Sequence, residues 1–149
     1  MVVKPRVMFL CTGNSARSQM AEAFLKKYAG GRFEVYSAGL EPKGIHPLTT
    51  RVMAEVGIDI SDQHSKDLAQ FLGKVHFGYL ITVCSRAEEE KCPTFPGIGV
   101  REHWALDDPA AVEGSEEDKL LKFRHVRDQI EERIKTWLEK QTQNTPNTA

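Results

Sequence analysis

The chain has 149 residues, of which 40% are hydrophobic and 28% charged, and its formal net charge is -1. This length suits one domain that buries its own core without disulfide or metal staples, and the composition excludes a disordered chain. No apolar run approaches the roughly 18 residues of a membrane span, and the N-terminus lacks a signal-peptide pattern. Basic and acidic residues are interspersed, so no nucleic-acid footprint is expected. We expect a cytoplasmic monomer that binds neither membrane nor nucleic acid.

The predicted elements alternate along the chain between strands and helices. Short apolar runs bounded by turn signals indicate strands at 7–10, 33–38 and 77–84, with a shorter one at 100–104. Apolar residues at helical spacing indicate helices at 19–28, 47–57 and 120–138, the last one preceded by a capping box at 115–118. This order predicts an α/β fold, a single-domain three-layer sandwich with a four-stranded parallel sheet. We assign residues 1–140 to the domain and 141–149 to a flexible polar tail.

The strongest chemical signal lies between the first strand and the first helix. It is the run Cys11-Thr12-Gly13-Asn14-Ser15-Ala16-Arg17-Ser18. Five residues between a Cys and an Arg can curl into an anion nest of inward N–H groups, to which the next helix adds its positive end. Arg17 can grip two anion oxygens, and Asn14 tolerates a left-handed backbone. The thiolate of Cys11 would then be a nucleophile aimed at phosphorus or a similar tetrahedral centre. The alternative is a buried strand-end Cys11 and a solvated Arg17.

A candidate proton donor lies in the run Asp107-Asp108-Pro109. A thiolate that displaces an oxygen needs an acid to protonate the leaving group. An Asp before Pro lies in an extended or turn segment and can project over the anion. On spacing alone, a plain Asp-Asp-Pro turn is the better explanation of these residues, and the Cys11 loop reverses that preference.

Two more cysteines, Cys84 and Cys92, are separated by seven residues, a spacing typical of neither zinc sites nor thioredoxin. Cys84 ends a predicted strand, as Cys11 does, so the same edge of a parallel sheet should hold both. Cys92 can reach Cys84 if the charged segment between them folds over, which requires Cα atoms about 4.4–6.8 Å apart. Alternatively, Cys84 is a buried strand-end residue and Cys92 an incidental surface thiol.

The run 11–23 resembles the signature of the low-molecular-weight tyrosine phosphatase fold, which is flavodoxin-like. Gln19-Met20-Ala21-Glu22 is more specifically similar to the thioredoxin-coupled arsenate reductases built on that fold, as are the runs 36–39 and 103–110 and the Cys92-Pro93 pair. The resemblance implies an arsenate reductase that needs no cofactor and uses thioredoxin as its reductant. It implies oxyanion binding by the loop residues Thr12, Gly13, Asn14, Ser15, Ala16, Arg17 and Ser18.

The resemblance also implies a relay of three cysteines. Cys11 attacks arsenic while Asp108 protonates the departing oxygen, with Asp107 in a supporting role. Cys84 then attacks the sulfur of Cys11 and releases arsenite. Cys92 attacks Cys84 in turn, and thioredoxin reduces the final disulfide.

The resemblance suggests a weak potassium site near Asn14, Glu22 and Ser37, and no other metal. Lys66 could instead supply a cation there. The alternative function is a low-molecular-weight protein tyrosine phosphatase that hydrolyses phosphate monoesters through a cysteinyl-phosphate intermediate. Against it, Pro109 is followed by Ala110-Ala111-Val112, where those phosphatases usually carry aromatic residues, although residual phosphatase activity is expected. A third alternative is a non-catalytic phosphate- or peptide-binding module.

Overall fold

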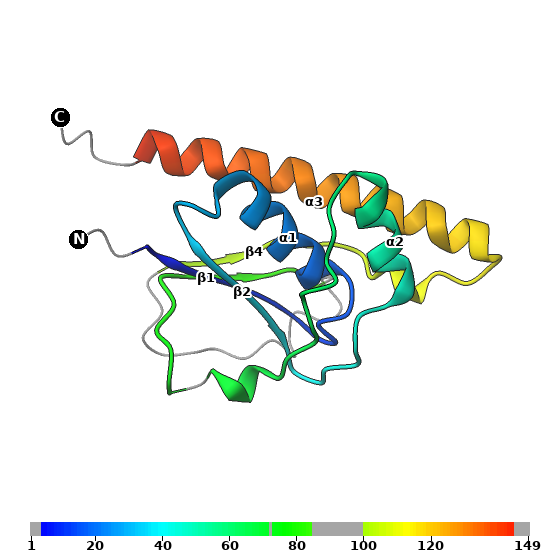
Figure 1. Cartoon of the computed structure of the whole chain (residues 1–149), viewed down its shortest axis with the longest axis horizontal. Coiled ribbons are helices and arrows are strands. Elements are labelled where there is room, and N and C mark those ends of the chain that lie inside the picture. Colours follow the sequence, from blue (N-terminus) through cyan, green and yellow to red (C-terminus); the bar gives the residue numbers. More distant parts are fainter. Residues whose placement is uncertain (1–3, 72, 85–99, 145–149) are drawn as a thin grey trace.

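The computed structural model describes residues 4–71, 73–84 and 100–144 (Figure 1). Its elements follow in the order β1 (Arg6–Cys11), α1 (Arg17–Ala29), β2 (Glu34–Gly39), α2 (Pro47–Glu55), the 3-10 helix η1 (Leu68–Gln70), β3 (Tyr79–Thr82), β4 (Val100–His103), the 3-10 helix η3 (Pro109–Ala111) and α3 (Glu116–Asn144). The four strands form one parallel sheet in the order β2-β1-β3-β4. The predicted α/β class and four-stranded parallel sheet are therefore confirmed.

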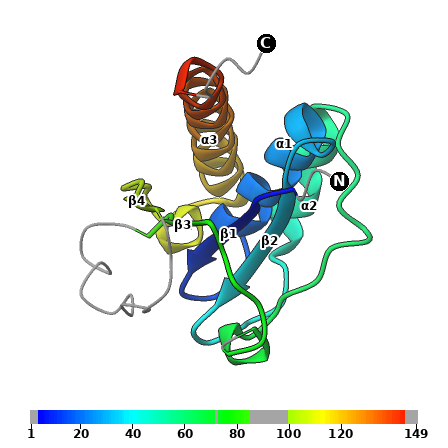
Figure 2. The same cartoon turned by 90° about the vertical axis from the view of Figure 1, so that its left-hand side faces the viewer.

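The main core lies between the sheet and the three long helices, which cover the same face of it (Figures 1 and 2). Side chains alternate along a strand, and β1 directs Val7, Phe9 and Cys11 into this core. Apolar side chains of α1, α2 and α3 meet them there. The predicted stripe of the last helix is buried in this core at Leu120, Phe123, Val126, Ile130, Ile134 and Trp137.

A smaller core lies on the opposite face of the sheet. Met8 and Leu10 of β1 point into it and are fully buried. Among the described residues, η1 and the segment up to β3 cover this face, where Phe71 and Phe77 meet the ring of Tyr36 edge to face. Both faces are covered as predicted, although the described covering of the second face is a 3-10 turn with loops.

Helix α3 begins with the predicted capping box. The backbone N–H of Asp118 donates to Ser115 Oγ at 3.1 Å, and the N–H of Ser115 donates to Asp118 Oδ2 at 3.2 Å. The helix continues to Asn144, past residue 140, where we placed the end of the domain, and the first helix-breaking residue after it is Pro146. Although α3 has 29 residues, no helix in the described ranges is apolar enough to cross a membrane.

Glu102 of β4 ties the edge of the sheet to α3. Its carboxylate accepts hydrogen bonds from Trp137 Nε1 at 2.8 Å and from Trp104 Nε1 at 3.2 Å. Both indoles are 2% exposed. Each buried N–H thereby has an acceptor, without which burial would be costly.

Candidate active site

The loop between β1 and α1 has the backbone path that its sequence predicts. Asn14 has φ 47°, which is left-handed, and no other described non-glycine residue has a positive φ. The Asn14 side chain braces the loop from within. Its Oδ1 accepts from the backbone N–H of Lys66 and from Gln19 Nε2, both at 2.9 Å, and its Nδ2 donates to Ser18 Oγ at 2.7 Å.

The β2–α2 connection runs beside this loop and holds its carbonyl groups. Thr12, Gly13 and Ser15 accept through their backbone oxygens from the N–H groups of Glu41, Lys43 and His46, at 2.9–3.0 Å. Carbonyl groups that are turned outward leave the loop N–H groups for an anion, as in a nest. The close approach needs Gly39, because a Cβ there would lie 2.7 Å from the oxygen of Thr12.

Helix α1 begins at Arg17, two residues before the predicted start at 19. Its N-cap is Ala16, and no side chain caps the helix. The N–H groups of the first turn have no helical partner, and their positive end suits an oxyanion. The anion loop and the helix start therefore form one continuous site.

Cys11 is 2% exposed and lies at the floor of the site. Its Sγ is 2.8 Å from Ser18 Oγ. Since Ser18 Oγ already accepts from Asn14 Nδ2, its single hydroxyl proton is available to the sulfur. The hydroxyl of Ser18, one of the predicted loop residues, therefore faces the sulfur of Cys11.

Arg17 and Asp108 face each other at the site. The guanidinium of Arg17 is 4% exposed and donates through Nη1 to the carbonyl oxygen of Leu106 at 3.1 Å. Its Nη2 lies 3.9 Å from Asp108 Oδ2. The other carboxylate oxygen, Oδ1, accepts from the N–H of Ala110 at 3.0 Å and caps η3. The turn therefore fixes the carboxylate and leaves Oδ2 facing the guanidinium.

Asp107 points elsewhere. Its side chain is 74% exposed and pairs with Lys122 Nζ at 3.0 Å, and it does not line the pocket. Of the two neighbouring carboxylates, that of Asp108, directly before Pro109, lines the pocket.

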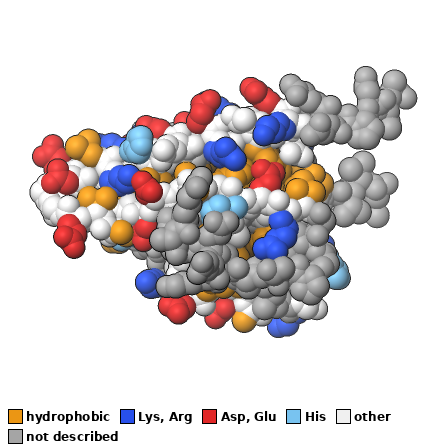
Figure 3. Space-filling view, turned by 180° about the vertical axis from the view of Figure 1, so that it is seen from behind, with side chains coloured by type: hydrophobic (Ala, Val, Ile, Leu, Met, Phe, Trp, Pro, Cys, Tyr) orange, Lys and Arg blue, Asp and Glu red, His pale blue; other side chains and the backbone are white. Residues whose placement is uncertain are grey.

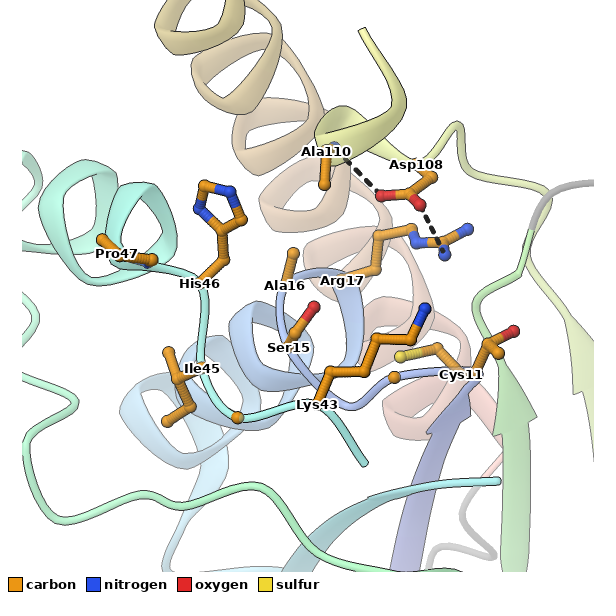
Figure 4. Close-up of a pocket in the computed structure, with 13 residues that line it drawn as sticks. Cys11, Ser15, Ala16, Arg17, Lys43, Ile45, His46, Pro47, Asp108 and Ala110 are labelled. Atoms are coloured by element: carbon orange, nitrogen blue, oxygen red, sulfur yellow. Dashed lines mark hydrogen bonds and ion pairs between the residues drawn. The ribbon is translucent and has the colours of Figure 1, made fainter. Parts of the chain in front are cut away.

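These groups surround one pocket of about 320 Å³ (Figure 4). Two side chains that sequence analysis missed, Lys43 and His46, also line it. His46 Nδ1 accepts from the N–H of Leu48 at 3.1 Å and caps α2. A His before a Pro that starts a helix hints at this cap, but nothing in the sequence brings 43–47 to the anion loop.

Cys84 is fully buried and follows β3, the neighbour of β1 in the sheet. Its Sγ lies 3.9 Å from the carbonyl oxygen of Leu10, the residue before Cys11. The backbone N–H of Leu106, whose oxygen holds Arg17, donates to the carbonyl oxygen of Cys84 at 3.3 Å. Cys11 and Cys84 therefore lie at the same edge of the sheet, and both are buried. Cys92 lies outside the described residues.

The region expected to hold potassium contains a lysine ammonium. Glu22 is 4% exposed, accepts from the Ser37 hydroxyl and pairs with Lys26. Lys66 Nζ lies 3.5 Å from Glu22 Oε1 and from Ser37 Oγ. Burial lowers the pKa of Lys66, and the attraction of Glu22 opposes that shift. In the described ranges, no group of three or more His, Cys, Asp or Glu side chains could hold a metal ion.

The fold and the site define a small α/β protein with a buried cysteine at the floor of a loop whose geometry suits an oxyanion. The family model described as low molecular weight phosphotyrosine protein phosphatase matches residues 6–147, and the chain belongs to this family.

Among its relatives, the arsenate reductase of Halalkalibacterium halodurans is 48% identical over 137 residues, which cover 91% of this chain and 96% of that protein. A solved arsenate reductase in the phosphate binding state has a TM-score of 0.74 and 36% identity, covering 91% of this chain and 98% of its own. The Corynebacterium glutamicum thioredoxin-dependent arsenate reductase has a TM-score of 0.68 and 31% identity, covering 92% of this chain and 61% of its own.

Proposed function

We propose that this chain reduces arsenate to arsenite and that thioredoxin returns it to the reduced state. The observation that carries the proposal is the placement of Cys84 at the end of the strand beside Cys11, next to a pocket that Cys11, Arg17 and Asp108 line. Hydrolysis of a phosphate ester requires only those three pocket residues. A second buried cysteine beside Cys11 can supply, together with Cys11, the two electrons that arsenate reduction requires. The names of the similar relatives support the same reaction.

In the first step, the oxyanion binds to the loop N–H groups and to the guanidinium of Arg17. The thiolate of Cys11 attacks arsenic, and a sulfur–arsenic bond forms as an oxygen departs on the far side. Asp108 gives that oxygen its proton, so the oxygen leaves as water. A positioned acid of this kind contributes about 10²- to 10⁴-fold to a rate. Ser18 stabilises the thiolate before the attack.

In the second step, the electrons move. The thiolate of Cys84 attacks the sulfur of Cys11, and a disulfide forms between the two residues. The sulfur–arsenic bond breaks, and its electron pair stays on arsenic, which is reduced from the +5 to the +3 state and leaves as arsenite. The two thiols have together lost two electrons.

In the last step, Cys92 attacks Cys84 and frees Cys11 for another cycle. This thiol exchange moves the disulfide away from the pocket. The dithiol of thioredoxin then reduces the Cys84–Cys92 disulfide and is itself oxidised. The buried position of Cys84 and Cys11 is the reason for a third cysteine, because a protein reductant needs access to the sulfur that it attacks.

The decisive experiment measures arsenite per protein molecule for wild-type protein and two variants, with thioredoxin, thioredoxin reductase and NADPH. Wild-type protein should turn over repeatedly with arsenate-dependent NADPH oxidation. Cys92→Ser should release about one arsenite per chain and stop with a Cys11–Cys84 disulfide, which peptide mass spectrometry detects. Cys84→Ser should release none.

Hydrolysis of an aryl phosphate by the same variants serves as the control for an intact anion loop. Cys11→Ser should abolish hydrolysis together with reduction. Sustained turnover by Cys92→Ser would remove Cys92 from the relay. Aryl phosphate hydrolysis without any arsenate-dependent NADPH oxidation in the wild-type protein would replace the proposal with the phosphatase alternative.

A further inference from the structure

A lysine lies at the mouth of the oxyanion pocket, and the proposed reaction assigns it no role. Lys43 lines the pocket together with Cys11, Arg17 and Asp108. Figure 4 shows its side chain extended across the mouth of the pocket, toward Cys11 and Arg17. Within the described part of the chain, its ammonium has no ion-pair partner. An unneutralised cation at this place acts on whatever anion the loop binds.

The position of Lys43 is built into the fold. Its backbone N–H donates to the carbonyl oxygen of Gly13 at 3.0 Å, within the same ladder that holds the anion loop. Its aliphatic stem passes over Gly13, where an added Cβ would lie 3.5 Å from Lys43 Cδ. The next residue, Gly44, has φ +81°, so the chain turns away directly after the lysine. Stem and backbone therefore both direct the ammonium over the loop.

The geometry of the attack tells which substrate atom meets this ammonium. A tetrahedral oxyanion places three oxygens against the loop and Arg17, and Cys11 attacks from the floor. The fourth oxygen therefore points in line away from the sulfur, toward the mouth. That is where Asp108 and Lys43 lie.

The fourth oxygen distinguishes two classes of substrate. In a free orthoanion it is a terminal oxygen that accepts a hydrogen bond from an ammonium. In a phosphate monoester it is bonded to carbon, and the organic group must occupy the mouth across which Lys43 extends. Among the described lining residues, His46 is the one aromatic side chain. Its ring already packs against Phe123, with ring centroids 4.8 Å apart, and the side chain beside Asp108 is the methyl group of Ala110, so the pocket offers an aryl ring little to stack on.

We propose that Lys43 is a specificity-determining residue that selects free orthoanions, arsenate and phosphate, over phosphate monoesters. It contacts the terminal oxygen of the orthoanion through its ammonium and obstructs the organic group of an ester. The proposal deepens the proposed function and rests on it for the identity of the reaction. The selectivity itself is a property of binding to the loop and does not require turnover.

The test measures how ligands protect Cys11 from iodoacetamide, followed on the Cys11 peptide by mass spectrometry. The two probes are inorganic phosphate and phenylphosphonate, whose fourth substituent is carbon. Lys43→Met keeps the stem over Gly13 and removes the charge, whereas Lys43→Arg keeps the charge. Lys74→Met is the matched control, because Lys74 is exposed and precedes β3 at the opposite edge of the sheet.

Lys43→Met should weaken protection by inorganic phosphate about fivefold to tenfold, the effect of one charge-assisted hydrogen bond near solvent. Protection by phenylphosphonate should stay the same or improve. Lys43→Arg should restore most of the preference, and Lys74→Met should change neither value. In turnover, KM for arsenate should rise while aryl phosphate kcat/KM does not fall.

Two results would overturn the proposal. Equal weakening of both probes would make Lys43 a general attractor of anions, and unchanged protection by both would remove it from the site. If the wild-type protein fails to reduce arsenate yet Lys43→Met loses its preference for phosphate over phenylphosphonate, the proposed reaction is wrong and the selectivity stands.

Discussion

Replacing Lys66 tests whether its ammonium stands in for a bound potassium ion. Lys66→Ala removes the ammonium that lies 3.5 Å from Glu22 Oε1 and leaves room beside that carboxylate. Lys66→Met removes the same charge but keeps the stem in place. The two variants therefore differ in whether a hydrated or partly hydrated cation can enter.

The structure sets the size of the effect. Removing one partner of a buried ion pair costs about 3–5 kcal/mol when the other charge is left alone. Here Lys26 still pairs with Glu22, although its side chain is 47% exposed, and Lys66 no longer has to be desolvated. We therefore expect each variant to lose about 2 kcal/mol of unfolding free energy, which lowers Tm by about 4–8 °C in a domain of this size.

The assay is thermal unfolding, followed by circular dichroism, in potassium chloride and in choline chloride of equal concentration. A site with a Kd of about 10 mM gains about 1.4 kcal/mol at 100 mM potassium. Lys66→Ala should therefore recover more than half of its loss in potassium chloride. Wild-type protein and Lys66→Met should melt at the same temperature in both salts.

Two results would refute this reasoning. A Tm of Lys66→Ala within 1 °C of wild type, an interval well inside the expected shift of about 4–8 °C, would show that the ammonium does not stabilise Glu22. A higher Tm of the wild-type protein in potassium chloride than in choline chloride would show that Lys66 does not replace the ion.

Substitutions at three further positions test the stability of the fold and the chemistry of the site. Glu102→Ala leaves two buried indole N–H groups without their acceptor. In urea titrations it should lower the unfolding free energy by about 2–3 kcal/mol. Glu102→Gln should lower the unfolding free energy by about half as much. Arg124 and Arg127 lower the pKa of Glu55 to about 2, so the carboxylate stabilises the fold above its unfolded pKa and loses this effect as pH falls toward 2. Glu55→Gln should accordingly cost about 0.5–1 kcal/mol at pH 7 and nothing near pH 2; a pH-independent difference would contradict the pairing. Asp108→Asn should slow reduction about 10²- to 10⁴-fold in stopped-flow measurements while phosphate still protects Cys11, and an unchanged rate would transfer the acid role to Asp107 or water.

The anion loop could be predicted because its determinants are local. The anion nest requires a Cys, a Gly, an Asn and an Arg at fixed spacing between a strand and a helix. Eight consecutive residues contain all of them. The left-handed φ of 47° at Asn14 follows from the preference of one side chain. The start of α1 was placed two residues late, because Arg17 and Ser18 are polar and buried, which an apolar pattern does not detect.

The prediction that residues far apart in the sequence lie together depended on the topology of the sheet. Parallel pairing of β1 with β3 puts the ends of both strands at the same edge of the sheet, and this general rule brought Cys84 to Cys11. No such rule relates 43–47 to the loop. Backbone hydrogen bonds hold the β2–α2 connection against the anion loop. Every residue type except proline can donate such a bond, so the identities of Lys43 and His46 do not reveal their position.

The sequence by itself predicted the class of fold, and it placed the candidate nucleophile Cys11, the anion loop and the pair of strand-end cysteines, because periodicity and short-range spacing encode them. Only the tertiary structure decided which of two adjacent carboxylates faces Arg17, that an ammonium lies against Glu22, and that Lys43 crosses the mouth of the pocket. Those three outcomes depend on the direction of side chains from separate elements. That direction is set when the core packs and the loops between elements are fixed, and no local pattern of residues records it.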